Sequence, residues 1–409
     1  MAVWLEIVRK LSSWYAAVVA CSRFRTESRV KSLFVTHSAA PAGAEFCILE
    51  LLSDKRIPAK VVFFQKGEMI SRFQEAGVPI EVLHGGDNLL RVSRKNFLYL
   101  ALAFSAVFHL IRELIRTGRE CAHFVAASQK ALLPCALAAC CTRKPLIWWL
   151  HDYLDPREFN SFALKAQILL ANLFADRVIC NSEATCDSFV ALGGRADKTR
   201  IVYCGIDVDH IVTTSDDTGL ARRCELGLEG KFVVGCFSRL APWKGQDLLL
   251  DCMSFLPSDT HLLLVGSALF GEQNYVDMLL AKISQLGLES RVHLIGFQAD
   301  IAPYLRACDV IVHTSRAPEA FGRVIVEGML SKRPVIAIDQ AGPREIINNE
   351  ADGLLVPINN MEAMRDALLR LHEDDNLRQQ LACAGYESAR KRFSLTLYRC
   401  AWIDVTSSL

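Results

Sequence analysis

The chain lacks the sequence features of several protein classes. It has 15 cysteines but no Cys-x-x-Cys pair, and the adjacent Cys140 and Cys141 do not have the spacing of metal ligands, which argues against zinc-ribbon and thioredoxin-like proteins. No other His/Cys/Asp cluster has metal spacing, and neither internal repeats nor low-complexity tracts occur. The net charge is only +1, and we expect no nucleic-acid partner, no metal and no cofactor. Cysteines in apolar runs, such as Cys180, Cys236 and Cys308, predict free buried thiols in a reducing cytosol.

The sequence also lacks an uninterrupted apolar run long enough to span a bilayer, which needs about 20 residues. Residues 1–22 have helical apolar spacing, but charged side chains interrupt it, and the order of a signal peptide is missing. We expect an amphipathic extension over residues 1–31 that either lies on a membrane surface or packs on protein. The segment Leu89–Arg119 combines an apolar stretch with basic flanks. It is more readily interpreted as a core helix, with contact to an anionic membrane surface on the cytoplasmic face as the alternative.

Length and pattern predict two α/β domains. A chain of 409 residues with 51% apolar residues fits two large cores. Short apolar runs alternate with helical patterns, which is typical of parallel sheets covered by helices on both faces. We therefore predict two Rossmann-like doubly wound lobes that face a cleft. The predicted strands are Ser32–Thr36, Lys60–Phe64, Ile80–Leu83, His123–Ala126, Leu146–Leu150, Arg177–Cys180 and Arg200–Val202, then Phe232–Ser238, His261–Val265, Val292–Phe297, Val310–His313, Val335–Ile338 and Gly353–Val356.

The predicted domains differ in charge. Residues 32–205 form the first lobe, 206–388 the second, and 389–409 a C-terminal helix that either crosses back to the first lobe or caps the second. Residues 1–205 contain 26 Lys/Arg and 18 Asp/Glu, a charge of +8, whereas residues 206–409 contain 20 and 27, a charge of −7. This asymmetry indicates either that the first half meets an anionic partner or that opposite charges help the lobes to associate.

The most informative motif is a pair of glutamates eight positions apart, Glu319 and Glu327, after the predicted strand Val310–His313. A turn at Gly322 is expected to open a helix whose N–H groups suit an anion. Glu319 then lies in the loop before the helix, and Glu327 lies about 7–8 Å along it. One carboxylate can meet a sugar and the other a ribose, with phosphate held between them. Two acidic residues at the start and on the surface of a helix are the simpler interpretation.

Further candidates also follow predicted strands. Arg239 and Lys244 flank a proline turn, where two cations suit a diphosphate. Gly43 lies in a loop of small residues, where we expect close approach to a ligand and freedom for a positive φ. His151 comes after a strand of large apolar residues and is expected at the edge of the cleft. The Asp207-Val208-Asp209 motif resembles a divalent-metal motif, but its position in the predicted linker favours a turn with solvated carboxylates.

Together these residues resemble the retaining glycosyltransferases of the GT-B fold, of the family four type. The likeness is strongest over residues 231–393, which also contain Val292-His293-Leu294-Ile295-Gly296-Phe297 and Ala341-Gly342-Pro343-Arg344-Glu345-Ile346-Ile347. It implies transfer of a sugar from a UDP- or GDP-sugar to a glycan or lipid-linked acceptor, with retention of configuration and without a metal. Glu319, His151, Arg239 and Lys244 would be the catalytic residues. The implied donor site is Gly43, Arg239, Lys244, Gly296, Phe297, Glu319, Phe321, Gly322, Arg323, Val324 and Glu327.

Two departures from the family pattern affect the expected choice of sugar. The usual paired glycines of the first loop are Ala42-Gly43, and Arg316-Ala317 precedes Pro318. Other functions remain open at this point: a nucleotide-sugar epimerase of similar fold, a non-catalytic two-lobed sugar-binding protein, or a non-catalytic partner subunit. Release of nucleoside diphosphate only in the presence of acceptor would distinguish a transferase from these.

Overall fold

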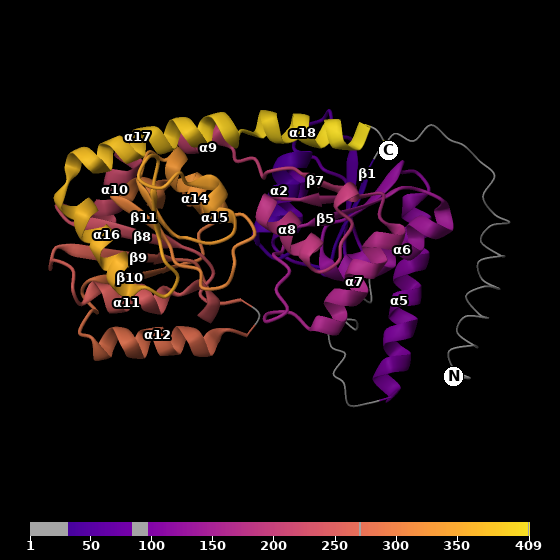
Figure 1. Ribbon diagram of the computed structural model, residues 1–409, viewed down its shortest axis with the longest axis horizontal. Helices are drawn as coiled ribbons and strands as arrows, with labels where there is room; N and C mark the ends of the chain where they lie inside the picture. Colours follow the sequence, from indigo (N-terminus) through magenta and orange to yellow (C-terminus); the bar gives the residue numbers. More distant parts are fainter. Residues whose placement is uncertain (1–31, 84–96, 270, 408) are drawn as a thin grey trace. The chain divides into compact units, whose positions relative to one another are not determined.

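The computed structural model describes residues 32–83, 97–269, 271–407 and 409. The predicted extension over residues 1–31 and the basic residues Arg91, Arg94 and Lys95 lie outside these ranges. The chain forms two compact units (Figure 1). Unit 1 contains residues up to Asn181, Cys186–Val202 and Arg399–Leu409, and unit 2 contains Ser182–Thr185 and Tyr203–Tyr398.

Unit 1 is built on a parallel sheet of seven strands in the order β3-β2-β1-β4-β5-β6-β7. The order reverses between β1 and β4, which is typical of a doubly wound sheet. The strands are β1 (Ser32–Thr36), β2 (Ala59–Phe63), β3 (Ile80–Val82), β4 (His123–Ala126), β5 (Leu146–Leu150), β6 (Arg177–Cys180) and β7 (Thr199–Ile201). The helices are α2 (Gly43–Leu52), α3 (Met69–Glu75), α5 (Phe97–Gly118), α6 (Gln129–Thr142), α7 (Ser161–Phe174), α8 (Glu183–Ala191) and the 3-10 helix η1 (Ala196–Lys198).

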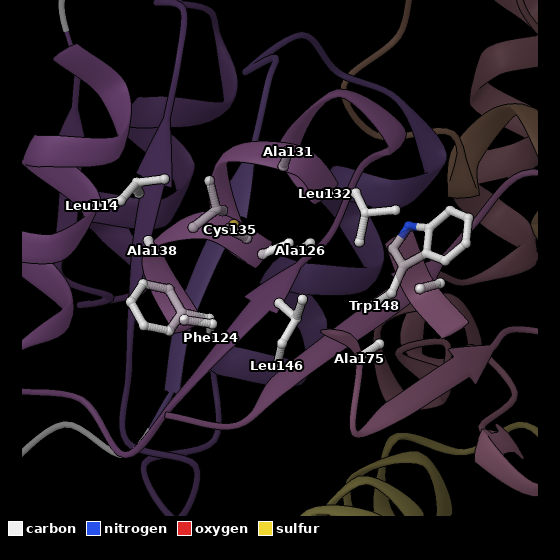
Figure 2. Packing of buried hydrophobic residues seen from close by; sticks show 14 of the residues in the cluster. Leu114, Phe124, Ala126, Ala131, Leu132, Cys135, Ala138, Leu146, Trp148 and Ala175 are labelled. Carbon is white, nitrogen blue, oxygen red and sulfur yellow. The ribbon is translucent and has the colours of Figure 1, made fainter. Parts of the chain in front are cut away.

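One face of this sheet packs against α5, α6 and α7 (Figure 2). Phe124 and Trp148 from the strands meet Leu132 and Cys135 of α6 and Leu114 of α5, and all five are fully buried. The strands are apolar on both faces because helices cover both, so their sequences are continuous apolar runs and not alternating patterns. Burial of Leu110, Leu114 and their neighbours confirms α5 as a core helix over its described side chains.

The C-terminal residues complete the other face of the same sheet. Trp402 is buried against Phe34, with ring centroids 5.3 Å apart, and against Trp149, at 4.6 Å. Arg399 donates from Nη2 to the carbonyl oxygen of Glu50 at 2.7 Å. Residues 399–409 therefore belong to the core of unit 1, although they are separated from it in the sequence by unit 2.

Unit 2 has a parallel sheet of six strands in the order β10-β9-β8-β11-β12-β13. Its strands are β8 (Phe232–Phe237), β9 (Thr260–Val265), β10 (Val292–Gly296), β11 (Val310–His313), β12 (Val335–Ile338) and β13 (Leu354–Val356). Its helices are α9 (Val208–Thr213), α10 (Asp216–Leu226), η2 (Pro242–Lys244), α11 (Gln246–Met253), α12 (Gln273–Gln285), α13 (Ala302–Ala307), α14 (Arg323–Leu330), α15 (Gly342–Ile346), α16 (Met361–Glu373), α17 (Asp375–Arg392) and α18 (Leu395–Ser407), the last of which continues into unit 1.

Helices α11, α12 and α16 bury their apolar side chains against one face of this sheet, whereas α14 packs on the other. Gly328 lets α14 approach closely, because a Cβ there would lie 3.0 Å from Val335 and 3.2 Å from Ile311. The order of the strands reverses between β8 and β11, so a crevice for a ligand is expected at the carboxyl ends of these two strands.

The predicted α/β class and both doubly wound sheets are confirmed. Each predicted strand is present with ends that agree within one residue. Cysteines in the described ranges are free thiols, and most are buried. Among the described residues, no helix combines the length and the apolar character needed to cross a membrane.

Candidate active site

The predicted cations and the first glutamate meet at the point where the strand order of unit 2 reverses. Arg239 follows β8, and Lys244 ends the short helix η2 in the same connection. Glu319 follows the neighbouring strand β11. Because carboxyl ends of parallel strands share one edge of a sheet, residues that are 75 positions apart come into contact there.

Glu319 is the centre of this cluster. Its Oε2 accepts hydrogen bonds from Lys244 Nζ and from Ser315 Oγ at 3.0 Å, and it lies 3.2 Å from His313 Nε2. Burial alone would raise the pKa of Glu319, but the charge of Lys244 and the hydrogen bond from His313 hold that pKa well below its usual range. Glu319 is therefore an anion at neutral pH, held in a fixed position and paired with a cation.

The loop that carries Glu319 is fixed from several sides. Arg316 binds both carboxylate oxygens of Asp247 on α11, at 2.9 and 2.8 Å. Gln340 donates to the carbonyl oxygens of Ser315 and Ala317, at 2.9 and 3.1 Å. The backbone N–H of Gly342 donates to the Glu319 carbonyl at 3.0 Å. The arginine that departs from the family pattern thus has a structural contact, which holds the loop of Glu319 against α11.

Arg239 is held on an aromatic surface. Its guanidinium carbon lies 4.6 Å from the centre of the Trp243 ring, and its Nε lies 3.5 Å from Glu272 Oε2. Burial lowers the pKa of Arg239 below its usual value. An arginine always remains protonated in proteins, so this means a partly dehydrated cation, which favours an anionic ligand.

The second glutamate lies on the helix that the sequence predicted. Gly322 has φ 104°, which favours glycine, and α14 starts at the next residue. Glu327 is on the second turn of α14, and its Oε1 accepts a hydrogen bond from Arg323 Nη2 at 3.2 Å. The N–H groups of Arg323 and Val324 lie at the start of α14, where a helix leaves N–H groups without a partner in a preceding turn.

The remaining predicted residues of unit 2 differ in their surroundings. The Phe321 ring is 3% exposed and packs edge-on against Phe393, so its side chain supports the loop and does not face solvent. Gly296 ends the edge strand β10 with φ 78°, and Phe297 beside it is 40% exposed. In the sheet, β9 lies between β10, which Gly296 ends, and β8, which Arg239 follows.

Gly43 and His151 lie at the carboxyl ends of β1 and β5 in unit 1. His151 directly follows β5 as predicted, and its ring packs on Trp149 with centroids 4.4 Å apart. Gly43 is the first residue of α2, and it does not use the positive φ that glycine allows. The first residue of a right-handed helix has a negative φ, so the absence of a side chain is the only property of glycine used there.

Asp207 was predicted to lie in a turn, and this is corrected by the structure. It is the N-cap of α9, where its carboxylate accepts a hydrogen bond from the His210 N–H at 3.1 Å. Aspartate is favoured at this position because it satisfies an N–H that lacks a partner within the helix. Asp209 lies in the first turn of the same helix. Asp207 therefore caps the helix on which Asp209 lies.

Several residues of the cluster were not predicted from the sequence. His313 was assigned only to a strand, and Ser315 and Gln340 were not singled out. His313 is the last residue of β11 and 4% exposed, and a polar residue at the carboxyl end of a central strand is a signal that could have been used. Gln340 has no such signal, because its contacts with the Glu319 loop form only after folding.

Unit 1 contains a buried carboxyl group that yields a stability prediction. Glu45 on α2 is 4% exposed and accepts a hydrogen bond from Thr36 Oγ1 at 3.1 Å, and burial raises its pKa to about 7. Because the pKa of Glu45 is higher in the folded than in the unfolded protein, the folded protein is more stable when this carboxyl group is protonated. This contribution is complete below the unfolded pKa of 4.5 and is lost as the pH rises through about 7.

We therefore expect Glu45→Gln to raise thermal stability at about pH 8, by at most about 3 kcal/mol, and to have little effect near pH 5. Thermal melting of the variant and the parent at both pH values measures this difference. The exposed Glu75 on α3 supplies the control, Glu75→Gln. An equal effect of Glu45→Gln at the two pH values would contradict the assignment of a raised pKa.

The comparisons with known proteins cover both units. Residues 222–388 match the family described as glycosyl transferases group 1, and residues 61–210 match glycosyltransferase family 4. The Anabaena protein HepE, solved with UDP and glucose, is 36% identical, with a TM-score of 0.85, and the match covers 93% of this chain and 100% of that chain.

Curated relatives match over shorter stretches. An N-acetylgalactosaminyltransferase of Campylobacter jejuni that acts on a diphospho-undecaprenol-linked sugar is 29% identical over 223 residues, 54% of this chain and 57% of the relative. The lipopolysaccharide core mannosyltransferase LpsB of Rhizobium meliloti is 29% identical over 222 residues, 51% of this chain and 62% of the relative. The chain thus spans somewhat more than half the length of these relatives. From the two family matches and the HepE structure, the chain belongs to the group 1 glycosyltransferases of the GT-B fold.

Proposed function

We propose that the protein is a retaining hexosyltransferase that moves a sugar from a nucleotide-sugar, with a UDP-sugar as the first candidate, to a glycan or lipid-linked acceptor. The observation that carries this proposal is the partly buried cluster in which Lys244 and His313 hold the carboxylate of Glu319 beside Arg239 and the start of α14. HepE, which was solved with UDP and glucose, supports the choice of UDP. The names of the curated relatives support a role in polysaccharide or glycolipid assembly.

The mechanism follows from where charge develops. When the bond between the anomeric carbon and the diphosphate oxygen breaks, negative charge accumulates on the diphosphate. Arg239, Lys244 and the N–H groups at the start of α14 stabilise this charge from fixed positions. Glu319 contacts a hydroxyl of the transferred sugar, and Glu327 contacts the ribose. Lys244 is paired with Glu319, and the donor diphosphate supplies it with a second anionic partner.

Retention requires that the acceptor attacks from the face that the diphosphate leaves. The acceptor oxygen forms the new bond to the anomeric carbon, and its proton passes to the leaving phosphate. No protein nucleophile takes part in this scheme. His151 steadies the sugar and does not attack it.

A direct test combines nucleotide-sugars with candidate acceptors and follows products by NMR. We expect release of nucleoside diphosphate only when acceptor is present, and a product with the anomeric configuration of the donor. An inverted product would refute retention. Conversion of the donor sugar without acceptor would instead favour a nucleotide-sugar epimerase. A thermal-shift screen of nucleotides identifies the donor base. A ligand at 100 times its dissociation constant stabilises the folded protein by about 2.7 kcal/mol.

Metal-independent transfer is a further part of the proposal. The charge that a divalent ion would neutralise is met here by Arg239, Lys244 and helix N–H groups, and Asp207 is used as a helix cap. Turnover in excess EDTA is therefore expected to stay close to the untreated rate, after removal of bound metal by dialysis. Loss of activity that Mn²⁺ or Mg²⁺ restores would show that transfer needs a metal.

We also propose that the protein attaches peripherally to the cytoplasmic face of a membrane, where it meets a lipid-linked acceptor. It rests on the charge of +8 over residues 1–205 and on the apolar and basic pattern of residues 1–31. Each Lys or Arg near an anionic surface contributes about 1 kcal/mol. We expect the protein to sediment with anionic vesicles at low salt, and less at high salt or with neutral vesicles. Equal recovery in the supernatant under all four conditions would refute attachment.

A further inference from the structure

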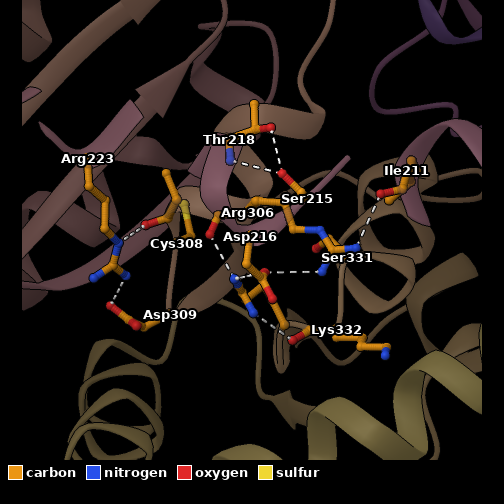
Figure 3. A network of polar contacts seen from close by, with 12 residues as sticks. Ile211, Ser215, Asp216, Thr218, Arg223, Arg306, Cys308, Asp309, Ser331 and Lys332 are labelled. Atoms are coloured by element: carbon orange, nitrogen blue, oxygen red, sulfur yellow. Dashed lines mark hydrogen bonds and ion pairs between the residues drawn. The ribbon is translucent and has the colours of Figure 1, made fainter. Parts of the chain in front are cut away.

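A cavity of about 310 Å³ lies in unit 2 at the edge of the sheet opposite Glu319. Two of its lining residues mark that edge, since Asp309 directly precedes β11 and Pro334 directly precedes β12. The rest of the lining comes from α10, α13, α17 and the turn after α14 (Figure 3). This volume is at the lower end of the range for small-molecule sites, which is about 300–1,000 Å³.

The lining is strongly basic. It includes the cations Arg223, Arg306, Lys332, Arg333 and Arg378. Asp216 and Asp309 are the carboxylates of the same lining, so its formal charge is +3. This excess stands out because residues 206–409 as a whole carry a charge of −7. A concave site with local positive charge in an acidic unit favours a small anion.

Asp309, one of the two carboxylates, is already paired with Arg223. Asp309 Oδ2 accepts from Arg223 Nη2 at 2.7 Å and from the Val233 N–H at 2.7 Å. Arg223 donates in addition to the Ala307 carbonyl at 2.7 Å (Figure 3). This pair is a structural ion pair, and it leaves little carboxylate charge for the other cations.

Arg306 and Arg333 are poorly neutralised by comparison. They share Asp216 Oδ1 at 3.4 and 3.3 Å, longer than the usual 2.7–2.9 Å of a charge-assisted hydrogen bond. The Asp216 side chain is 70% exposed, whereas that of Arg306 is 6% exposed. Within the part of the chain that the structure describes, the buried Nε atoms of Arg306 and Arg333 have no hydrogen-bond partner. Buried donors of this kind are rare without a bound water or ion.

The electrostatics agree with this geometry. Burial lowers the pKa of Arg306, Asp216 raises it again in part, and the positive charge of Arg333 lowers it further. Lys332 adds a cation at the exposed rim, where its Nζ lies 5.0 Å from the centre of the Tyr386 ring. An anion in the cavity would relieve the repulsion between these cations.

We propose that this cavity binds a phosphate group, either free or as the monoester of a small metabolite, with Arg306, Arg333 and Lys332 as its ligands. Arginine forks match phosphate oxygens, and a dianion neutralises more of the excess charge than a carboxylate does. The cavity adjoins the turn after α14, the helix whose first turns carry Arg323 and Glu327 of the donor site. Phosphate at the far end of α14 therefore binds to the same element as the donor, at a separate site.

The experiment is calorimetric titration of the full chain with inorganic phosphate and with glycerol phosphate, at constant ionic strength and with saturating UDP. UDP occupies the diphosphate site, so binding that remains under these conditions is independent of it. We expect one saturable site. Arg306→Gln is expected to weaken it about tenfold or more, because a buried charged contact is lost. The double variant Lys332→Gln/Arg333→Gln changes only the rim and turn, and it tests the same point if Arg306→Gln does not fold.

Arg390→Gln is the matched control, since Arg390 lies on α17 outside the cavity and pairs with Glu387. It is expected to bind phosphate like the parent. Binding of inorganic phosphate but not of the monoester would identify the free ion as the ligand, and binding of both would support a phosphorylated metabolite. Absence of saturable binding in the presence of UDP, or unchanged affinity in the folded variants, would overturn the proposal.

Discussion

Replacement of Lys244 by methionine is expected to slow sugar transfer by roughly 10²–10³-fold, the usual effect of removing one preorganised donor from a site of developing negative charge. Lys244 is 19% exposed and is held in place by its contact with Glu319. It can therefore stabilise the leaving diphosphate without reorganisation at the moment of reaction. Methionine keeps much of the apolar stem and removes only the charge.

The measurement is the single-turnover rate with saturating donor and acceptor, alongside thermal melting to confirm folding. Lys282→Met is the matched control, because Lys282 on α12 forms a 2.7 Å ion pair with Asp251 on α11 of the same unit. We expect the control to retain the parent rate. A Lys244→Met variant that is folded and transfers at the parent rate would remove Lys244 from the mechanism.

Arg239→Ala is expected to weaken binding of nucleoside diphosphate by about 2–5 kcal/mol, which is at least about tenfold in dissociation constant. Its guanidinium is partly dehydrated and supported by the ring of Trp243, so its contact with diphosphate forms at little cost in side-chain ordering. The effect should appear in both binding and turnover, since Arg239 contacts the diphosphate in the ground state and also stabilises the negative charge that grows on it in the transition state.

Calorimetry with UDP, followed by GDP if UDP does not bind, measures this change. Arg370→Ala is a suitable control, since Arg370 is 48% exposed and pairs with Glu350. If the Arg239→Ala variant binds the same nucleotide with the affinity of the parent, Arg239 does not belong to the donor site.

The strands could be predicted because their burial on both faces leaves a clear sequence pattern. Runs such as Leu146–Leu150 and Val310–His313 are apolar without alternation, and each is bounded by polar or turn residues. Gly322 and Glu327 could also be placed, because a glycine before a helical pattern indicates where the helix starts. Local signals of this kind depend on neighbours in the chain, so the sequence alone was sufficient.

The helix cap at Asp207 and the conformation of Gly43 show where local signals fail. Aspartate is favoured both in turns and at helix N-caps, because the same carboxylate satisfies backbone N–H groups in either case. Glycine is likewise compatible with both signs of φ, so the presence of Gly43 at the start of α2 did not fix the backbone. Each residue type allows two structures, and its identity alone does not choose between them.

The sequence by itself determined the two parallel sheets, the positions of Arg239, Lys244 and Glu319 at strand ends, and the family. Tertiary structure decided which side chains meet there. Only the parallel pairing of β8 with β11 brings Lys244 to Glu319, and only folding places His313 beside that carboxylate and Gln340 against the backbone of its loop. The cavity around Arg306 was likewise invisible in the sequence, because its cations come from separate helices and turns. Contacts between distant segments follow from the order of strands in space, and the amino-acid pattern of any one segment does not record that order.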